Sequence, residues 1–171
     1  MTLYTIGHST RTLDQFIALL RVHEIAQLAD VRTVPKSRRH PHFAREALSR
    51  SLPAAAIAYR HFAGLGGLRK PRQDSQNTAW RHESFRGYAD HMQTPAFREA
   101  LDELIEWSAV PTVVMCAEAV WWHCHRQLIA DALVARGIDV RHIISAAPAP
   151  QHALTSFARV EGGHVTYPGL I

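Results

Sequence analysis

Two hydrophobic patterns alternate along the chain. Short, β-favouring apolar runs predict strands, and apolar residues repeated every three or four positions predict helices. The predicted strands are residues 3–6, 25–31, 57–62, 112–116 and 139–144. The predicted helices are residues 13–20, 43–52, 84–88, 95–107 and 124–136. This alternation predicts an α/β fold with a single doubly wound, mostly parallel sheet flanked by helices.

Turn-forming residues mark the ends of these elements. Thr12 stands where an N-cap is expected, and Gly137 stands where a helix C-terminus is expected. Gly162-Gly163 divides the tail at 157–167 into a predicted C-terminal β-hairpin. Residues 64–81 are rich in Gly, Pro and polar side chains and predict a long loop. Long loops in compact domains are typically functional lids or disordered segments.

Length and composition restrict the class of protein. The 171 residues fit one α/β domain, residues 1–171, with enough apolar side chains for a core. No apolar run reaches the roughly 18 residues of a membrane span, so no membrane partner is expected. The first residues lack the basic and apolar regions of a secretory signal. Only two cysteines are present, which excludes a disulfide scaffold and favours a cytoplasmic protein.

The positive charge is concentrated in one part of the chain. Residues 32–86 hold 12 of the 19 Lys and Arg residues and 3 of the 15 acids, whereas the remainder is net acidic. Seventeen of the 19 basic residues are Arg, whose planar fork of donors matches phosphate and carboxylate oxygens. The bias indicates an anionic partner, either a small molecule or a nucleic acid. An incidental bias of a solvated surface is the alternative.

Polar residues follow three of the predicted strands. In open α/β sheets, ligands bind outside the carboxyl ends of the strands. The segments at this edge are His8-Ser9, Asp30-Val31-Arg32 and Cys116-Ala117-Glu118. The predicted helix after Cys124 carries His125 and Arg126 in its first turn, where free N–H groups favour an anion. We therefore expect a functional site here.

Several of these residues also have a purely structural interpretation. His8 could be a turn residue that bonds the backbone, and Asp30 and Arg32 could pair with each other instead of clamping a ligand. Cys116 ends a buried strand and is typical of a small core residue. Cys124, at a helix N-terminus, could instead be a nucleophile of lowered pKa.

The tryptophan pair and Glu118 also allow more than one interpretation. The pair Trp121-Trp122 could wall a pocket, although a place in the core is favoured. Glu118 is a candidate general acid, general base or nucleophile.

Metal binding is poorly specified by the sequence. Cys116, Cys124, His8, His123 and His125 include enough donors for zinc. The seven residues between the cysteines match no compact zinc pattern, which typically has two to four. We therefore expect no metal and no cofactor.

The motifs together resemble the domain of unknown function 488 family. They are Tyr4–Ser9, Asp30-Val31-Arg32, Pro35–Arg38, Leu65-Gly66-Gly67, Cys116-Ala117-Glu118 and Cys124-His125-Arg126. Many members have Asp-Pro between the last two motifs, where this chain has Val120-Trp121, which resembles a tryptophan-bearing bacterial subgroup. The resemblance implies a compact α/β fold but no reaction. It implies a shared site around His8, Arg32, Glu118, His125 and Arg126.

Three hypotheses about function follow. The first is an enzyme, a hydrolase or transferase acting on a phosphate-bearing substrate, with Glu118, His8 and His125 as its catalytic residues. Its substrate-binding residues would be Ser9, Asp30, Arg32, Lys36, Ser37, Arg38 and Arg126. The second is a non-enzymatic nucleic-acid-binding module that uses the Arg-rich segment and Trp80.

The third hypothesis is a thiol enzyme of sulfurtransferase type that uses Cys116 or Cys124. It ranks last, because neither cysteine sits in the short Cys-to-Arg loop of such sites. All three hypotheses are compatible with a homo-oligomer.

Overall fold

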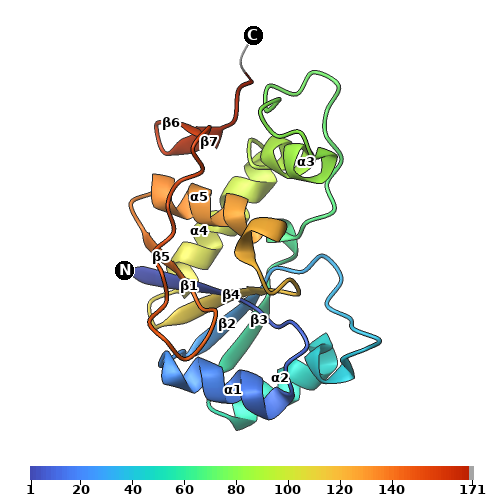
Figure 1. Cartoon of the computed structure of the whole chain (residues 1–171), viewed down its shortest axis with the longest axis vertical. Coiled ribbons are helices and arrows are strands. Elements are labelled where there is room, and N and C mark those ends of the chain that lie inside the picture. Colours follow the sequence, from blue (N-terminus) through green and yellow to red (C-terminus); the bar gives the residue numbers. More distant parts are fainter. Residues whose placement is uncertain (170–171) are drawn as a thin grey trace.

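The computed structural model describes residues 1–169 and has a five-stranded parallel sheet at its centre (Figure 1). The strands are β1 (Thr2–Gly7), β2 (Gln27–Asp30), β3 (Ala58–His61), β4 (Thr112–Cys116) and β5 (Asp139–His142). Their order in the sheet is β3-β2-β4-β1-β5, and every neighbouring pair is parallel. The predicted α/β class is confirmed. The central strand β4 is buried along its whole length, as its continuous apolar run requires.

Helices cover both faces of the sheet (Figure 1). On one face lie α1 (Leu13–Val22) and α2 (Arg45–Ala54). On the other lie α4 (Pro95–Trp107) and α5 (Arg126–Ala135), with α3 (Glu83–His91) beside them. The predicted hairpin is confirmed as β6 (Arg159–Glu161) and β7 (His164–Thr166), which pair antiparallel. None of the helices in residues 1–169 combines the length and apolar character that crossing a membrane requires.

Three single-turn 3₁₀ helices complete the chain, and two of them adjoin helices that begin later than predicted. They are η1 (Pro41–Phe43), η2 (Ala63–Leu65) and η3 (Trp121–His123). Ala44 and Cys124 follow η1 and η3 in extended conformation, so α2 begins at Arg45 and α5 at Arg126. The start of α1 is as predicted, because Thr12 and Gln15 form a reciprocal capping box. Gly137 follows α5 with φ +80°, as a C-terminal glycine does.

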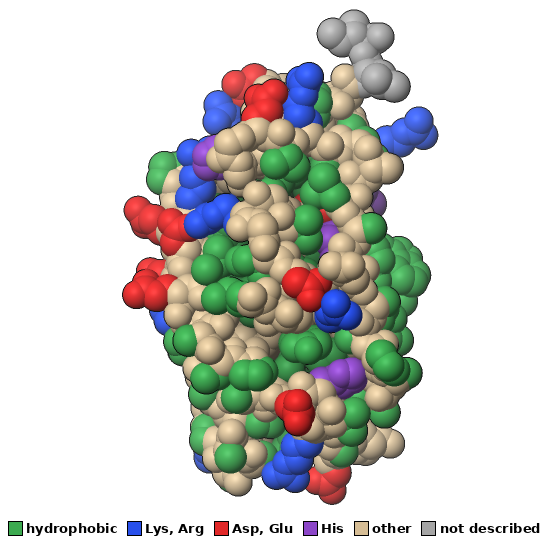
Figure 2. All heavy atoms as spheres, turned by 90° about the vertical axis from the view of Figure 1, so that its left-hand side faces the viewer, with side chains coloured by type: hydrophobic (Ala, Val, Ile, Leu, Met, Phe, Trp, Pro, Cys, Tyr) green, Lys and Arg blue, Asp and Glu red, His purple; other side chains and the backbone are tan. Residues whose placement is uncertain are grey.

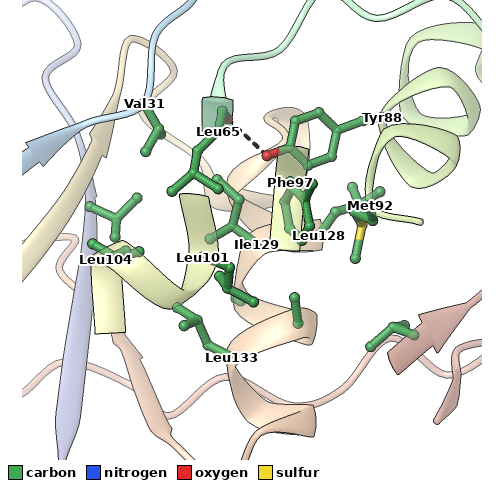
Figure 3. Close-up of a cluster of buried hydrophobic side chains, with 14 of the residues drawn as sticks. Val31, Leu65, Tyr88, Met92, Phe97, Leu101, Leu104, Leu128, Ile129 and Leu133 are labelled. Atoms are coloured by element: carbon green, nitrogen blue, oxygen red, sulfur yellow. Dashed lines mark hydrogen bonds between the residues drawn. The ribbon is translucent and has the colours of Figure 1, made fainter. Parts of the chain in front are cut away.

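The core has two parts, one on each face of the sheet. Figure 3 shows the part between the sheet, α4 and α5, where Leu101 and Leu104 face Ile129 and Leu133. The Tyr88 hydroxyl of α3 donates to the Leu65 carbonyl at 2.8 Å in the same cluster. This bond ties the start of the long 64–81 segment to α3.

A second anchor holds the rest of the 64–81 segment. The buried Asp90 carboxylate of α3 accepts from the Arg72 N–H, the Ser75 hydroxyl and the Asn77 amide at 2.6–2.8 Å. Because these donors satisfy a buried charge, they fix the segment against α3. The segment is therefore packed against α3, and only its Gly67 and Leu68 line the cavity at the carboxyl ends of the strands.

The connections of β2 and β4 leave the sheet on opposite sides. The chain after β2 leads to α2 on one face, and the chain after β4 leads to α5 on the other. Because β2 and β4 are neighbours, their diverging connections open a crevice, which is the position where α/β sheets bind ligands.

Candidate functional site

A cavity of about 350 Å³ lies at the diverging ends of β2 and β4. Its wall combines residues after β2, the 64–81 segment, the start of α3, the end of β4 and the approach to α5. They are Arg32, Thr33, Val34, Lys36, Gly67, Leu68, Ser84, Phe85, Cys116, Ala117, Glu118, His123, Cys124 and His125. We refer to it as the strand-end pocket. Its size is within the range of small-molecule sites.

Arg32 is fixed in the pocket wall by a buried ion pair. Its Nε and Nη2 donate to the two oxygens of Asp30 at 2.9 and 2.7 Å, and Nη2 also donates to the Phe43 carbonyl. Tyr59 donates to the same carboxylate at 2.5 Å. Burial lowers the pKa of Arg32, but the Asp30 carboxylate outweighs it and raises that pKa overall. The remaining nitrogen, Nη1, is buried with no partner among the described residues.

The two thiols and an imidazole line the same pocket. Cys116 is 2% exposed and Cys124 is 6% exposed. His125 Nε2 lies 2.8 Å from the Val31 carbonyl, so this nitrogen carries the hydrogen, and Nδ1 lies 3.5 Å from Cys124 Sγ. Burial lowers the pKa of His125, which keeps the ring neutral and Nδ1 free to accept a proton.

The pKa values of the two thiols move in opposite directions. Burial and the neighbouring Cys124 sulfur raise the pKa of Cys116. Burial also acts to raise the pKa of Cys124, but the Cys116 thiol and the positive charge of Arg126 lower it overall. A lowered pKa beside a cation at the start of a helix is typical of a reactive cysteine.

Arg126 lies behind the thiols and is 1% exposed. Nη1 donates to Thr5 Oγ1 at 3.2 Å, and Nη2 donates to the Glu118 carbonyl at 2.7 Å. Nε has no partner, and within residues 1–169 no carboxylate lies within ion-pairing distance of the guanidinium. A buried cation of this kind favours an anion nearby.

The close packing of β1 against the segment after β4 depends on Gly7. A Cβ at Gly7 would collide with the Glu118 carbonyl. Beyond it, the N–H groups of His8 and Ser9 donate to the carbonyls of Cys116 and Ala117 at 2.9 and 3.0 Å. These contacts hold the segment that supplies Glu118.

The outer rim of the pocket is apolar and strained. Leu68 is 85% exposed and has φ +58°, a left-handed conformation that a leucine adopts at a cost of about 1–2 kcal/mol. Val34 is 56% exposed, and Phe85 is half-buried beside it in the pocket wall. Strained residues at a pocket indicate a functional constraint.

The structure brings six of the predicted site residues to the pocket: Arg32, Lys36, Cys116, Glu118, Cys124 and His125. Lys36 and Glu118 are exposed there. Asp30 and Arg126 lie behind the pocket and hold its wall. The other predicted residues are His8, Ser9, Ser37 and Arg38, and none of them lines it.

These four residues have other surroundings. His8 stacks on Phe43 with centroids 4.3 Å apart and bonds the Ser9 carbonyl, and burial lowers its pKa to about 4. Ser37 accepts from the His40 N–H, and Arg38 is exposed. Ser9 is half-buried with φ +53°.

The favoured place of Trp121-Trp122 in the core is wrong for Trp122, which is 48% exposed. Trp121 is half-buried and stacks on His142, outside the pocket. The stacking platform suggested at Trp80 is also wrong, because this side chain is 9% exposed and packs against Phe85 and Phe157. On the face in Figure 2, basic side chains are interspersed with acidic and apolar ones and form no continuous patch.

Some pocket residues were missed by the sequence analysis. Ser84 and Phe85 come from α3, which reaches the pocket only because the 64–81 segment folds back on it. Thr33 and Val34 directly follow Arg32, so the position of β2 could have indicated them. No group of three His, Cys, Asp or Glu residues suited to a metal ion occurs in the described part of the chain.

Comparison with known proteins gives one match. The model of the family described as "Domain of unknown function DUF488" matches residues 12–133, which include all fourteen pocket residues. No curated protein and no solved structure matches the chain. Since the match covers more than half of the sequence, the chain belongs to the DUF488 family.

Proposed function

We propose that this protein is a cysteine-dependent hydrolase or transferase that acts on a phosphate-bearing small molecule in the strand-end pocket. The observation that carries the proposal is the Cys124–His125 pair, with Sγ 3.5 Å from Nδ1 in the wall of a cavity. A thiol and a base within reach of each other form the usual arrangement for nucleophilic catalysis.

His125 is suited to take the thiol proton. The Val31 carbonyl holds the hydrogen on Nε2, so Nδ1 presents its lone pair towards Cys124. The buried Arg126 guanidinium then stabilises the thiolate, which balances its otherwise unpaired charge. Both groups act on the same sulfur.

The anion would bind at the basic side of the pocket. Asp30 holds two nitrogens of Arg32, and the third, Nη1, is buried without a partner in residues 1–169. Lys36 lines the pocket from an exposed position. A phosphate would lie against the Arg32 side chain in the pocket wall, and the mobile ammonium of Lys36 would donate to its oxygens. The apolar rim at Leu68 and Phe85 would cover the remainder of the substrate.

The chemistry follows from these positions. Cys124 loses its proton to His125, and Sγ attacks the electrophilic atom of the substrate. The sulfur–substrate bond forms while the bond to the leaving group breaks, and the leaving group takes the proton from His125. Glu118, at the exposed edge of the pocket, would act as general base for the water or acceptor that releases the product.

This proposal changes the order of the hypotheses drawn from the sequence. A carboxylate nucleophile is less well supported, because Glu118 is exposed and its carboxylate has no hydrogen-bond partner among residues 1–169. The thiol hypothesis rises because the consecutive residues Cys124, His125 and Arg126 bring a thiol, an imidazole and a buried cation together beside the pocket. The nucleic-acid-binding hypothesis is less well supported, because Trp80 is buried and cannot stack on a base.

The test is the rate at which iodoacetamide alkylates each cysteine, read by peptide mass spectrometry over a pH series. We expect Cys124 to react faster than a free cysteine peptide at pH 7 and Cys116 to react slowly. Inorganic phosphate or a nucleoside monophosphate should protect Cys124, and K36Q should weaken this protection. K70Q removes an exposed lysine outside the pocket and serves as the control.

Two outcomes would contradict the proposal. Alkylation of Cys124 at or below the rate of the free peptide would remove the nucleophile. Equal protection in wild type and K36Q would place the anion elsewhere. Affinity for oligonucleotides alone, falling steeply with salt, would instead support the binding module.

A further inference from the structure

A chain of buried polar side chains runs away from the strand-end pocket behind Arg126. Thr5 Oγ1 lies 2.6 Å from His142 Nδ1, and His142 Nε2 lies 2.8 Å from His152 Nδ1. His152 Nε2 lies 2.8 Å from Asp131 Oδ1. All four side chains are at most 5% exposed. Burying so many polar groups costs free energy unless each of them has a hydrogen-bond partner.

The hydrogen bonds of this chain all point the same way. Asp131 is a carboxylate that also accepts from the Thr155 N–H and the Tyr167 hydroxyl, so His152 donates to it through Nε2. In a neutral His152 ring, Nδ1 then accepts from His142 Nε2–H. His142 Nδ1 in turn accepts from the Thr5 hydroxyl.

The other end of this hydrogen-bonded chain reaches Arg126, the cation next to the proposed nucleophile. Thr5 Oγ1 accepts from Arg126 Nη1 at 3.2 Å. Four hydrogen bonds therefore connect the buried Arg126 cation to the buried Asp131 anion, which lies five residues further along α5. Because the interior screens charge weakly, each bond in such a chain polarises the next.

The Trp121 ring packs against the two histidines of this hydrogen-bonded chain. Its ring stacks on His142 with centroids 4.4 Å apart and an angle of 4° between the planes, and it meets the His152 ring edge-on at 5.3 Å. The ring limits access of water to both imidazoles. Burial lowers the pKa of His142 to about 3, and the charge of Arg126 acts in the same direction, so this ring is neutral at pH 7.

We propose that Thr5, His142, His152 and Asp131 form a positioning relay that holds the Arg126 guanidinium where it stabilises the Cys124 thiolate. The inference rests on the proposed function and adds residues that do not touch the pocket. Thr5, His142 and His152 lie outside the part of the chain that matches the family model. The relay therefore assigns a role to the first strand and to the C-terminal segment.

Thr5 offers a matched pair of variants. T5V keeps the shape of the side chain in β1 but removes the hydroxyl, whereas T5S keeps the hydroxyl. T112V removes a buried hydroxyl from the neighbouring β4 outside the relay and is the control. The measurement is the pH midpoint of Cys124 alkylation, with folding checked by thermal melting. The titratable and charged groups around Cys124 are Cys116 of β4, Tyr88 of α3, His125 just before α5 and Arg126 at the start of α5.

We expect T5V to raise the midpoint by about half a pH unit, which is about threefold less thiolate at low pH. T5S and T112V should keep the wild-type midpoint. A fast-reacting wild-type Cys124 with the same midpoint in T5V and T5S would overturn the relay but leave the proposed function standing. A slow wild-type Cys124 would overturn the proposed function itself.

A second measurement needs no variant. Nitrogen NMR of the imidazoles in the wild-type protein at pH 7 should find both His142 and His152 neutral and protonated on Nε2. Protonation of His142 on Nδ1, or a charged His152, would reverse the direction of the bonds and overturn the relay even if T5V failed to fold.

Discussion

Two buried histidines should make the protein sensitive to mild acid. Burial lowers the pKa of His8 to about 4 and that of His142 to about 3, and the two side chains are 4% and 1% exposed. In the unfolded chain both would titrate near the ordinary value of about 6.5. Between these values the unfolded state binds protons that the folded state does not, so stability is complete above about pH 6.5 and falls as the pH decreases towards 4.

The size of the effect follows from the two pKa values. Each histidine costs about 1.4 kcal/mol for each pH unit below 6.5, so each removes about 2 kcal/mol at pH 5. Together they would remove about 4 kcal/mol, a large share of the roughly 5–15 kcal/mol that stabilises a domain. The free energy of unfolding should therefore fall strongly between pH 7 and pH 5.

Urea unfolding at several pH values measures this loss. H8N keeps a side-chain donor for the Ser9 carbonyl but cannot titrate, so it should reduce the loss between pH 7 and pH 5 by about 2 kcal/mol. H164N, at an exposed position of the hairpin, should leave the loss unchanged. A pH dependence in H8N equal to that of the wild type would refute the reasoning, as would a wild type of constant stability.

Three further predictions concern the site and its supports. D30N should lower the free energy of unfolding by about 3–5 kcal/mol in urea melts, because it leaves the Arg32 charge buried and unpaired. The control D102N, which breaks the exposed pair with Arg136, should lower it by about 1 kcal/mol or less. L68G should raise stability by about 1 kcal/mol by relieving the left-handed backbone yet weaken phosphate protection of Cys124; unchanged protection would show that the strained rim has no role in binding. T12A should cost about 1 kcal/mol in thermal or urea unfolding, since it removes one half of the capping box of α1, and a neutral result would mean that Gln15 alone caps this helix.

Local sequence patterns were sufficient to predict the secondary structure. Strands, helices and the hairpin follow from the period of apolar positions and from turn residues, which are properties of neighbouring residues. The gathering of polar residues at the carboxyl ends of the strands also followed, because parallel strands bring these ends to one edge. The starts of α2 and α5 were displaced, because the extended Ala44 and Cys124 carry no signal in a helical pattern.

The tertiary structure decided which candidates share a pocket. Cys124 and His125 lie far along the chain from Val31, yet the order of the sheet places the Val31 carbonyl where it fixes the His125 tautomer. Burial acts to raise the pKa of both cysteines, and the groups next to Cys124, the Cys116 thiol and Arg126, lower that of Cys124 overall. The sequence shows neither the exposure of the two thiols nor their neighbours. In the sequence, nothing distinguishes His142 from an ordinary strand residue. Only the structure shows that the C-terminal segment places His152 within hydrogen-bonding distance of it.

The sequence by itself therefore determined the fold class and the edge of the sheet that carries the polar residues. The tertiary structure alone decided hydrogen-bond partners, burial and charge compensation. The physical reason is the distance in sequence over which each effect acts. Backbone preference and hydrophobic period depend on a few neighbouring residues, whereas the protonation state of a thiol or an imidazole depends on groups that the whole sheet brings together.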